Sequence, residues 1–154
     1  MRILAISDSH GATAPITKAI DMLTPDVVCF LGDGARQAEN IADECNIPFH
    51  IVKGNCDLGF YEESKLIELC GKRIFMTHGH KYYVKGGVGT LKEAARKTGA
   101  DIVLFGHTHT PFEQYDNGLY MLNPGSCACP RNAKPSCGYV DIVGGSVVTN
   151  IVEL

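Results

Sequence analysis

The sequence lacks a long apolar segment and an excess of charge of one sign. No apolar run among its 154 residues approaches the roughly 20 residues that cross a bilayer. The first apolar stretch is broken by Asp8 and His10, unlike the continuous apolar region of a signal peptide. A net charge of −3 gives no basis for a nucleic-acid-binding surface, which is usually strongly basic. We therefore expect a cytoplasmic protein that binds neither membranes nor nucleic acids.

Paired-cysteine motifs and a nucleotide-binding loop are also missing. The seven cysteines form an odd set without a CxxC pair, so we expect free thiols rather than disulfides or a thiolate metal site. Cys127, Cys129 and Cys137 are close enough in sequence for a small metal or redox cluster, but this signal is weak. The glycines at 86, 87 and 89 are not followed by Gly-Lys-Ser/Thr, which excludes a Walker loop.

The composition is that of an ordinary globular domain, with 45% hydrophobic and 20% charged residues. The first third of the chain alternates strand and helix patterns. Apolar runs predict buried strands at 2–7, 26–31 and 47–52. Helical spacing of apolar residues predicts helices from Thr13 to 24 and over 35–45. Such alternation implies right-handed crossovers and a parallel sheet.

The remainder of the chain is richer in antiparallel patterns. Strands are expected at 64–70 and 72–77, then a helix over 88–98 and a strand at 102–105. Asn117-Gly118 and Gly144-Gly145 separate two further pairs of strands and predict hairpins. No linker divides the chain, so we expect one α/β domain over residues 1–154.

Five of the predicted strands are followed within a few residues by side chains that bind metals. Ligands gather at the carboxyl ends of strands in such sheets, so these side chains are expected to converge. The ligands are Asp8 and His10, Asp33, Asn55, His78, and His107 with His109.

The types of these seven ligands indicate the chemistry of the site. Carboxylate, amide and imidazole groups without thiolate suit Mn²⁺, Fe or Zn²⁺. Seven ligands are too many for one open catalytic ion and suit two ions held by a bridging carboxylate. Two adjacent ions can polarise a phosphoryl group and generate hydroxide at neutral pH. This pattern predicts a two-metal hydrolase of phosphate esters.

Simpler interpretations exist for several of these residues. Asp8 and Asp33 both precede helical segments and could cap them. His80 could contact the substrate phosphate or hold a loop, and His50 is expected to be structural. Asn123-Pro124-Gly125-Ser126 is interpreted as a tight turn in preference to a substrate contact. Arg131 and Lys134 could bind phosphate but are expected to face solvent.

The five blocks D-x-H, G-D, G-N, H and G-H-x-H, in this order, resemble the calcineurin-like metallophosphoesterases. The length of the chain and its G-N-C-D motif are most similar to those of the small YfcE-like phosphodiesterases. These proteins share their fold with a retromer scaffold subunit. The resemblance implies a four-layer α/β/β/α sandwich without a cap domain. It also implies one metal on Asp8, His10, Asp33 and His109, and a second on Asp33, Asn55, His78 and His107. A hydroxide between the ions would attack phosphorus.

One position departs from the family pattern. Many larger members follow the metal-binding Asn with a His that assists the transition state or the leaving group, and this chain has Cys56 there. A thiol, with an ordinary pKa of about 8.5, is a poorer acid partner for a phosphoryl oxygen. We therefore expect a preference for leaving groups of low pKa.

These observations predict a phosphodiesterase with Asp33, Asn55 and His80 as catalytic residues and two divalent ions as cofactors. Mn²⁺ is the first choice of metal, with Fe²⁺, Ni²⁺ and Zn²⁺ as alternatives. A phosphomonoesterase using the same site and a scaffold protein on the same fold are the alternatives in function. The expected partner is a small phosphoester. A homodimer paired through the late apolar strands remains open.

Overall fold

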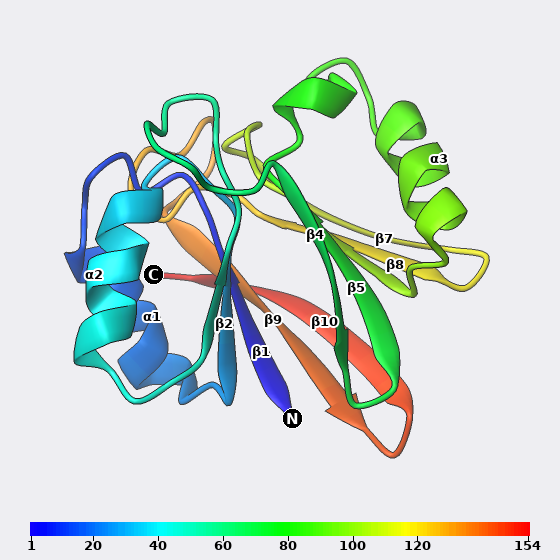
Figure 1. Ribbon diagram of the computed structural model, residues 1–154, viewed down its shortest axis with the longest axis horizontal. Coiled ribbons are helices and arrows are strands. Elements are labelled where there is room, and N and C mark those ends of the chain that lie inside the picture. The colour runs from blue at the N-terminus through cyan, green and yellow to red at the C-terminus, as the bar shows by residue number, and fades with distance from the viewer.

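The computed structural model describes all residues, Met1–Leu154, and contains two five-stranded sheets (Figure 1). The first sheet has the strand order β10-β9-β1-β2-β3. Its members are β1 (Arg2–Ile6), β2 (Val27–Phe30), β3 (Phe49–Ile51), β9 (Ser136–Val143) and β10 (Ser146–Glu153). The strands β1, β2 and β3 are parallel, and β9 returns antiparallel to β1. Three parallel strands therefore end at the same edge of this sheet.

The second sheet has a similar arrangement, with the order β4-β5-β6-β8-β7. Its members are β4 (Ser64–Leu69), β5 (Lys72–Thr77), β6 (Ile102–Leu104), β7 (Pro111–Asp116) and β8 (Leu119–Pro124). Here β5, β6 and β8 run parallel, and β4 and β7 are antiparallel edge strands. This sheet also presents the carboxyl ends of three parallel strands together.

Helices cover the outer face of each sheet. The helices α1 (Ala14–Leu23) and α2 (Ala35–Glu44) pack on the first sheet, and their buried side chains share a core cluster with β1 and β2. The helix α3 (Gly89–Thr98) packs on the second sheet, and the short 3-10 helix η1 (His80–Tyr82) precedes it. Figure 1 shows these groups of helices on opposite sides of the two sheets. The predicted four-layer α/β/β/α architecture is confirmed.

The largest core cluster lies between the two sheets. It joins inward-facing side chains such as Ile3 and Cys29 of the first sheet to Ile74, Met76 and Leu104 of the second, all with no exposed surface. Burying apolar side chains of this size contributes about 1.5–3 kcal/mol each. The two sheets are thus held face to face, which fixes their strand ends relative to one another.

Most predicted elements are present, with differences at their ends. Thr13 occupies the N-cap position of α1 but makes no side-chain capping hydrogen bond. The third strand is shorter than expected, and η1 was not predicted. No helix in the structure is both long enough and apolar enough to span a lipid bilayer.

Candidate metal centre

The seven predicted ligands follow the carboxyl ends of strands in both sheets. Those of the first sheet follow β1, β2 and β3 and are Asp8, His10, Asp33 and Asn55. Those of the second sheet follow β5 and β6 and are His78, His107 and His109. The site is therefore built where the two sheets meet.

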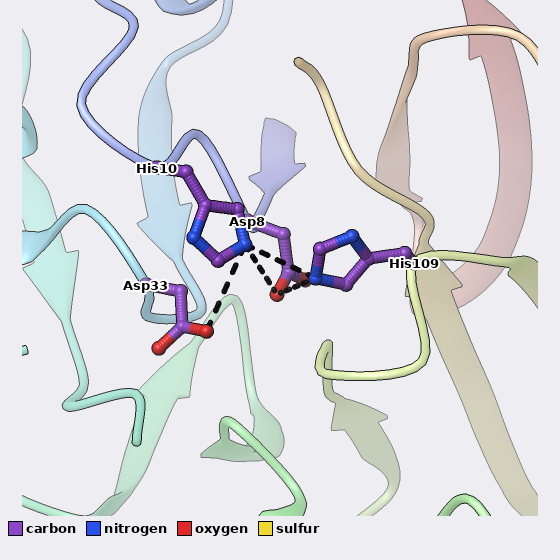
Figure 2. Close-up of side chains that lie close together, drawn as sticks. All are labelled: Asp8, His10, Asp33 and His109. Carbon is purple, nitrogen blue, oxygen red and sulfur yellow. Dashed lines mark hydrogen bonds and ion pairs between the residues drawn. The ribbon is translucent and has the colours of Figure 1, made fainter. Parts of the chain in front are cut away.

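Four of these side chains form a compact cluster. One ligand atom each from Asp8, His10, Asp33 and His109 lies within 4.8 Å of all the others. Figure 2 shows the four side chains pointing toward one another from three separate segments of the chain. His10 Nε2 lies 3.1 Å from His109 Nε2 and 3.8 Å from Asp33 Oδ2. This is a suitable set of oxygen and nitrogen donors for a first-row divalent metal.

Asp8 lies at the bottom of this cluster and is fully buried. Its Oδ2 accepts hydrogen bonds from Ser7 Oγ at 2.7 Å and from the His107 N–H at 3.0 Å. Its Oδ1 is buried and has no hydrogen-bond partner. That oxygen lies 3.2 Å from His109 Nε2 and 4.0 Å from His10 Nε2. A buried carboxylate oxygen without a partner is costly, and a bound cation would compensate for it.

A second group of ligands adjoins the first through Asp33. His78 is fully buried, and its Nδ1 donates to the Leu31 carbonyl at 2.7 Å. This hydrogen bond places the proton of the neutral ring on Nδ1 and leaves a free lone pair on Nε2. His78 Nε2 lies 3.5 Å from Asp33 Oδ2 and 3.2 Å from His107 Nδ1. The geometry again directs lone pairs of several ligands to one place.

Two predicted residues lie at the margin of these groups. The His80 ring is 5.5 Å from that of His78 and 6.0 Å from that of His107, measured between centroids. Asn55 is exposed, and its amide donates to Cys56 Sγ at 3.2 Å. The backbone beside Asn55 contacts the site, because the N–H of the following residue, Cys56, donates to Asp33 Oδ1 at 2.8 Å.

The protonation of Asp33 suits a metal ligand. Burial acts to raise the pKa of the Asp33 carboxyl, but its interactions with His78 and the Cys56 N–H outweigh burial and hold that pKa well below its usual range. The carboxylate is therefore anionic at neutral pH.

The histidines differ in protonation. Burial and the neighbouring His78 lower the pKa of His107 to about 4, so its imidazole is neutral at pH 7. The Asp8 carboxylate, whose Oδ1 lies 3.2 Å from His109 Nε2, raises the pKa of His109 above its usual range. In the same way, the carboxylates of Asp33 and Asp8 outweigh burial and raise the pKa of His78. Protons and metal therefore compete for the lone pairs of these last two imidazoles.

The backbone at the site adopts an uncommon conformation. Asp8, His10, Asp33, His107 and His109 all have positive φ angles, between 45° and 70°. Only ten residues other than glycine do so in the whole chain, so half of them are predicted ligands. Such conformations cost energy and cluster at functional sites. The fold maintains this strain where the ligands converge.

Glycines allow the ligand loops to approach one another closely. A Cβ atom on Gly54 would lie 2.1 Å from Asp33 Oδ1, and one on Gly106 would lie 2.0 Å from Ser7 Oγ. Any larger residue would push the loops apart. This explains physically why Asn55 and His107 are each preceded by glycine.

The capping interpretation of Asp8 and Asp33 is wrong. Neither is the N-cap residue of a helix, since α1 begins after Thr13 and α2 after Gly34. The carboxylate that serves the start of α2 is Asp57, which sequence reasoning did not single out. Asp57 accepts hydrogen bonds from the N–H groups of Gly34 and Ala35 at 2.8 and 2.9 Å. Its only signal in the sequence is its place directly after the G-N-C segment.

The segment Asn123–Ser126 supports the ligand loops, a role broader than that of a turn. The Asn123 amide donates to the Gly106 carbonyl at 2.9 Å and to Thr108 Oγ1 at 3.0 Å. Ser126 Oγ donates to the Asp8 carbonyl at 2.6 Å. Both side chains are fully buried. They position the backbone of the ligand loops after β6 and β1.

The cysteines are free thiols, and none of them belongs to the four-residue ligand cluster. Cys127 and Cys137 lie in the apolar core under α1 and α2. Burial raises the pKa of Cys127 to about 12 and that of Cys137 to about 11. Both remain protonated at neutral pH, which does not suit the small metal cluster that the spacing of Cys127, Cys129 and Cys137 weakly suggested.

The family model for the calcineurin-like phosphoesterase superfamily domain matches residues 1–145. The chain belongs to this superfamily. A relative in Bacillus subtilis (strain 168), named probable metallophosphoesterase YsnB, is 33% identical over 134 residues, covering 85% of this chain and 78% of that protein. The resemblance noted in the sequence is confirmed, and the family is one of hydrolases that use divalent metals.

Solved structures show the same fold. A conserved uncharacterized protein of Streptococcus pneumoniae TIGR4, described as a predicted phosphoesterase, aligns with a TM-score of 0.84 at 27% identity and covers 99% of this chain and 88% of its own. Wild-type Vps29 of Entamoeba histolytica, complexed with Zn²⁺, aligns with a TM-score of 0.78 at 26% identity and covers 99% and 98% of the two chains.

Proposed function

We propose that the protein is a phosphodiesterase that uses two divalent metal ions. The first ion would be held by Asp8, His10, Asp33 and His109, and the second by Asp33, Asn55, His78 and His107. Mn²⁺ is the proposed metal, and Fe²⁺, Ni²⁺ or Zn²⁺ suit the same donors. Bound ions would supply the Lewis acidity that polarises the phosphoryl group and activates water.

The observation that carries this proposal is the unpartnered Oδ1 of Asp8. Three imidazole nitrogens surround this buried oxygen, those of His109, His78 and His10, at 3.2, 3.9 and 4.0 Å. His109 and His78 each use Nδ1 to donate to a backbone carbonyl, so each directs the lone pair of Nε2 toward the carboxylate. Lone pairs that converge on an unsatisfied oxygen favour a bound cation.

Two close approaches between imidazoles support two metal positions. His10 and His109 approach at 3.1 Å, and His78 and His107 approach at 3.2 Å. The two pairs belong to the two separate ligand sets. Asp33 lies between them, since its Oδ2 is 3.8 Å from His10 Nε2 and 3.5 Å from His78 Nε2. Its other oxygen is held by the Cys56 N–H. Asp33 is therefore suited to bridge.

His80 is proposed to contact the substrate phosphate. It is partly exposed and lies beside the second ligand set. Burial and the neighbouring His78 lower the pKa of His80, so the imidazole is neutral at pH 7. A neutral imidazole can donate to a phosphoryl oxygen and orient the ester for attack.

Two alternative functions use the same fold. A phosphomonoesterase would use the same ligands, and the choice between monoester and diester depends on the surroundings of the ions. A scaffold role is suggested by the similarity to Vps29, and because that protein binds Zn²⁺, metal binding alone does not distinguish the two roles. The small phosphoester partner, the cytoplasmic location and a homodimer remain predictions.

The test is hydrolysis of bis-p-nitrophenyl phosphate beside p-nitrophenyl phosphate. The protein is stripped with a chelator and assayed before and after addition of Mn²⁺. We expect metal-dependent hydrolysis with the diester preferred, and His109→Ala should lower it by roughly 100-fold or more. His50→Ala is the matched control, because His50 lies in β3 and belongs to neither ligand set. Preferred hydrolysis of the monoester would favour the phosphomonoesterase, and no turnover with any metal would favour the scaffold.

A further inference from the structure

A polar cavity of about 300 Å³ adjoins the four-ligand cluster beside His10 and Asp33. Its remaining walls are the Gly11 loop, the first turn of α2 with Gln37, and the Cys56-Asp57 segment. Only one of its seven lining residues is hydrophobic. Because the cavity shares His10 and Asp33 with the candidate metal centre, a group bound in it would lie beside that centre.

The cavity does not favour a second anion. It lies at the start of α2, where free N–H groups would normally attract a phosphate. Here Asp57 already accepts the N–H groups of Gly34 and Ala35, and its other oxygen accepts those of Asp33 and Gly54 at 2.8 Å. No lysine or arginine lines the cavity. A neutral group is therefore accommodated better than a phosphate or a carboxylate.

Two residues that line the cavity each carry a polar group without a partner in the protein. Gln37 lines the cavity and is half-buried, and its carboxamide makes no hydrogen bond with the chain. Gly11 faces it, since a Cβ on Gly11 would lie 3.9 Å from Gln37 Nε2, and the Gly11 N–H also makes no hydrogen bond. A carboxamide can both donate and accept. Hydroxyl groups have the same dual capacity and match this pair.

We propose that this cavity binds the alcohol portion of the ester, and that Gln37 selects a neutral alcohol carrying hydroxyl groups, such as glycerol or a sugar. The proposal deepens the proposed phosphoesterase function and rests on it. Gln37 acts on specificity through the part of the substrate that does not react. A hydroxyl-binding site rejects an analogue without hydroxyls because its polar groups are then left unpaired.

The kinetic test compares 2,3-dihydroxypropyl and propyl p-nitrophenyl phosphate, which differ only in two hydroxyl groups. We expect the Mn²⁺-loaded wild type to favour the dihydroxypropyl ester by about tenfold in kcat/KM, mainly through KM. Gln37→Leu should bring this ratio close to one. Gln114→Leu is the control, because Gln114 is the only other glutamine and is exposed on β7. No preference in the wild type, or an unchanged ratio in Gln37→Leu, would overturn the proposal.

A binding experiment separates failure of the subsite from failure of the catalytic proposal. The protein is labelled with ¹⁵N-glutamine and loaded with Zn²⁺, then titrated with glycerol 3-phosphate or propyl phosphate. We expect glycerol 3-phosphate to shift the side-chain amide signals of Gln37 and leave those of Gln114 unmoved, with smaller shifts from propyl phosphate. This result in a protein without hydrolytic activity would support the subsite and reject the enzyme. Unmoved Gln37 signals at saturation would reject the subsite even in an active enzyme.

Discussion

At the scale of the residue, Cys56 sets the acid chemistry beside the metal centre. Its thiol accepts a hydrogen bond from the Asn55 amide. Although the residue as a whole is exposed, local desolvation together with Asp33 raises the pKa of the thiol to about 11. The thiol is therefore neutral at pH 7, and it is a weak hydrogen-bond donor. It can contribute little to protonation of a departing alkoxide. Ester hydrolysis should therefore depend strongly on the pKa of the leaving group.

Cys56→His should improve hydrolysis of alkyl diesters more than that of activated aryl diesters. An imidazole with a pKa near neutrality can assist an alkoxide of high pKa, and general acids of this kind contribute about 100-fold or more. The measurement is the ratio of kcat/KM for an alkyl diester to that for bis-p-nitrophenyl phosphate. We expect this ratio to rise at least tenfold in the variant.

The control for that prediction is Cys70→His, which places the same side chain in the exposed β4–β5 turn away from the metal centre. It should leave the ratio unchanged. Equal rates on alkyl and activated diesters in the wild type would contradict the role assigned to the thiol.

The grouping of Asp8, His10, Asp33 and His109 could be predicted because each follows an apolar strand, in the order typical of the family. Other features of the site could not be predicted in this way. The positive φ angles of Asp8 and His107 result from packing between loops, which no local pattern records. Asp57 and Gln37 are ordinary polar residues until the fold brings a second loop against them.

At the scale of the element, Asp57 joins the loop after β2 to the loop after β3. Its four hydrogen bonds, at 2.8–2.9 Å, reach the backbones of both loops. One loop carries Asp33 and the other carries Asn55, both of which are proposed ligands. A single carboxylate therefore caps α2 and positions ligands on two elements.

Asp57→Asn should weaken both the fold and the metal site. An amide can accept at only one of its two atoms, so two N–H groups lose their acceptor, and loss of a helix cap costs about 1–2 kcal/mol. We expect a melting temperature lower by several degrees. We also expect roughly tenfold weaker metal binding at low temperature, where the variant is still folded.

Asp43→Asn on the exposed side of α2 is the matched control for these measurements, made by thermal denaturation and metal titration. It should change stability by less than about 0.5 kcal/mol. Asp57→Asn with lower stability but unaltered metal affinity would restrict Asp57 to a capping role.

The hairpins were predictable from their turns, whereas some element ends were not. Asn117 and Gly118 both have positive φ angles, as a two-residue hairpin turn requires. The strand expected at 47–52 is limited to Phe49–Ile51, because it pairs with β2 over three residues only. Pairing with a neighbour decides such boundaries, and apolar pattern alone does not contain that information.

At the scale of the whole molecule, the candidate metal centre spans the junction of the two sheets. Asp8 and Asp33 come from the first sheet, and His78, His107 and His109 come from the second. Bound metal would connect the sheets beyond the contacts of their shared core. The division into two sheets was implied by the family resemblance. It does not follow from periodicity, because β9 and β10 return to the first sheet from the far end of the chain.

Metal should therefore raise the melting temperature of the stripped protein. A ligand present at 100 times its dissociation constant stabilises a fold by about 2.7 kcal/mol, which corresponds to about 5–10 °C for a chain of this size. Calorimetry with and without Mn²⁺ measures the shift. His107→Ala should reduce it and His50→Ala should retain it. An equal shift in both variants would mean that the ions bind elsewhere.

The most direct test of the account is the number of metal ions bound per chain. Calorimetric titration of Mn²⁺ into stripped protein should give two ions for the wild type. It should give one each for His10→Ala and His107→Ala, because each variant removes a ligand from a different set. A single ion or none in the wild type, or two ions retained in either variant, would contradict a two-metal centre bridged by Asp33.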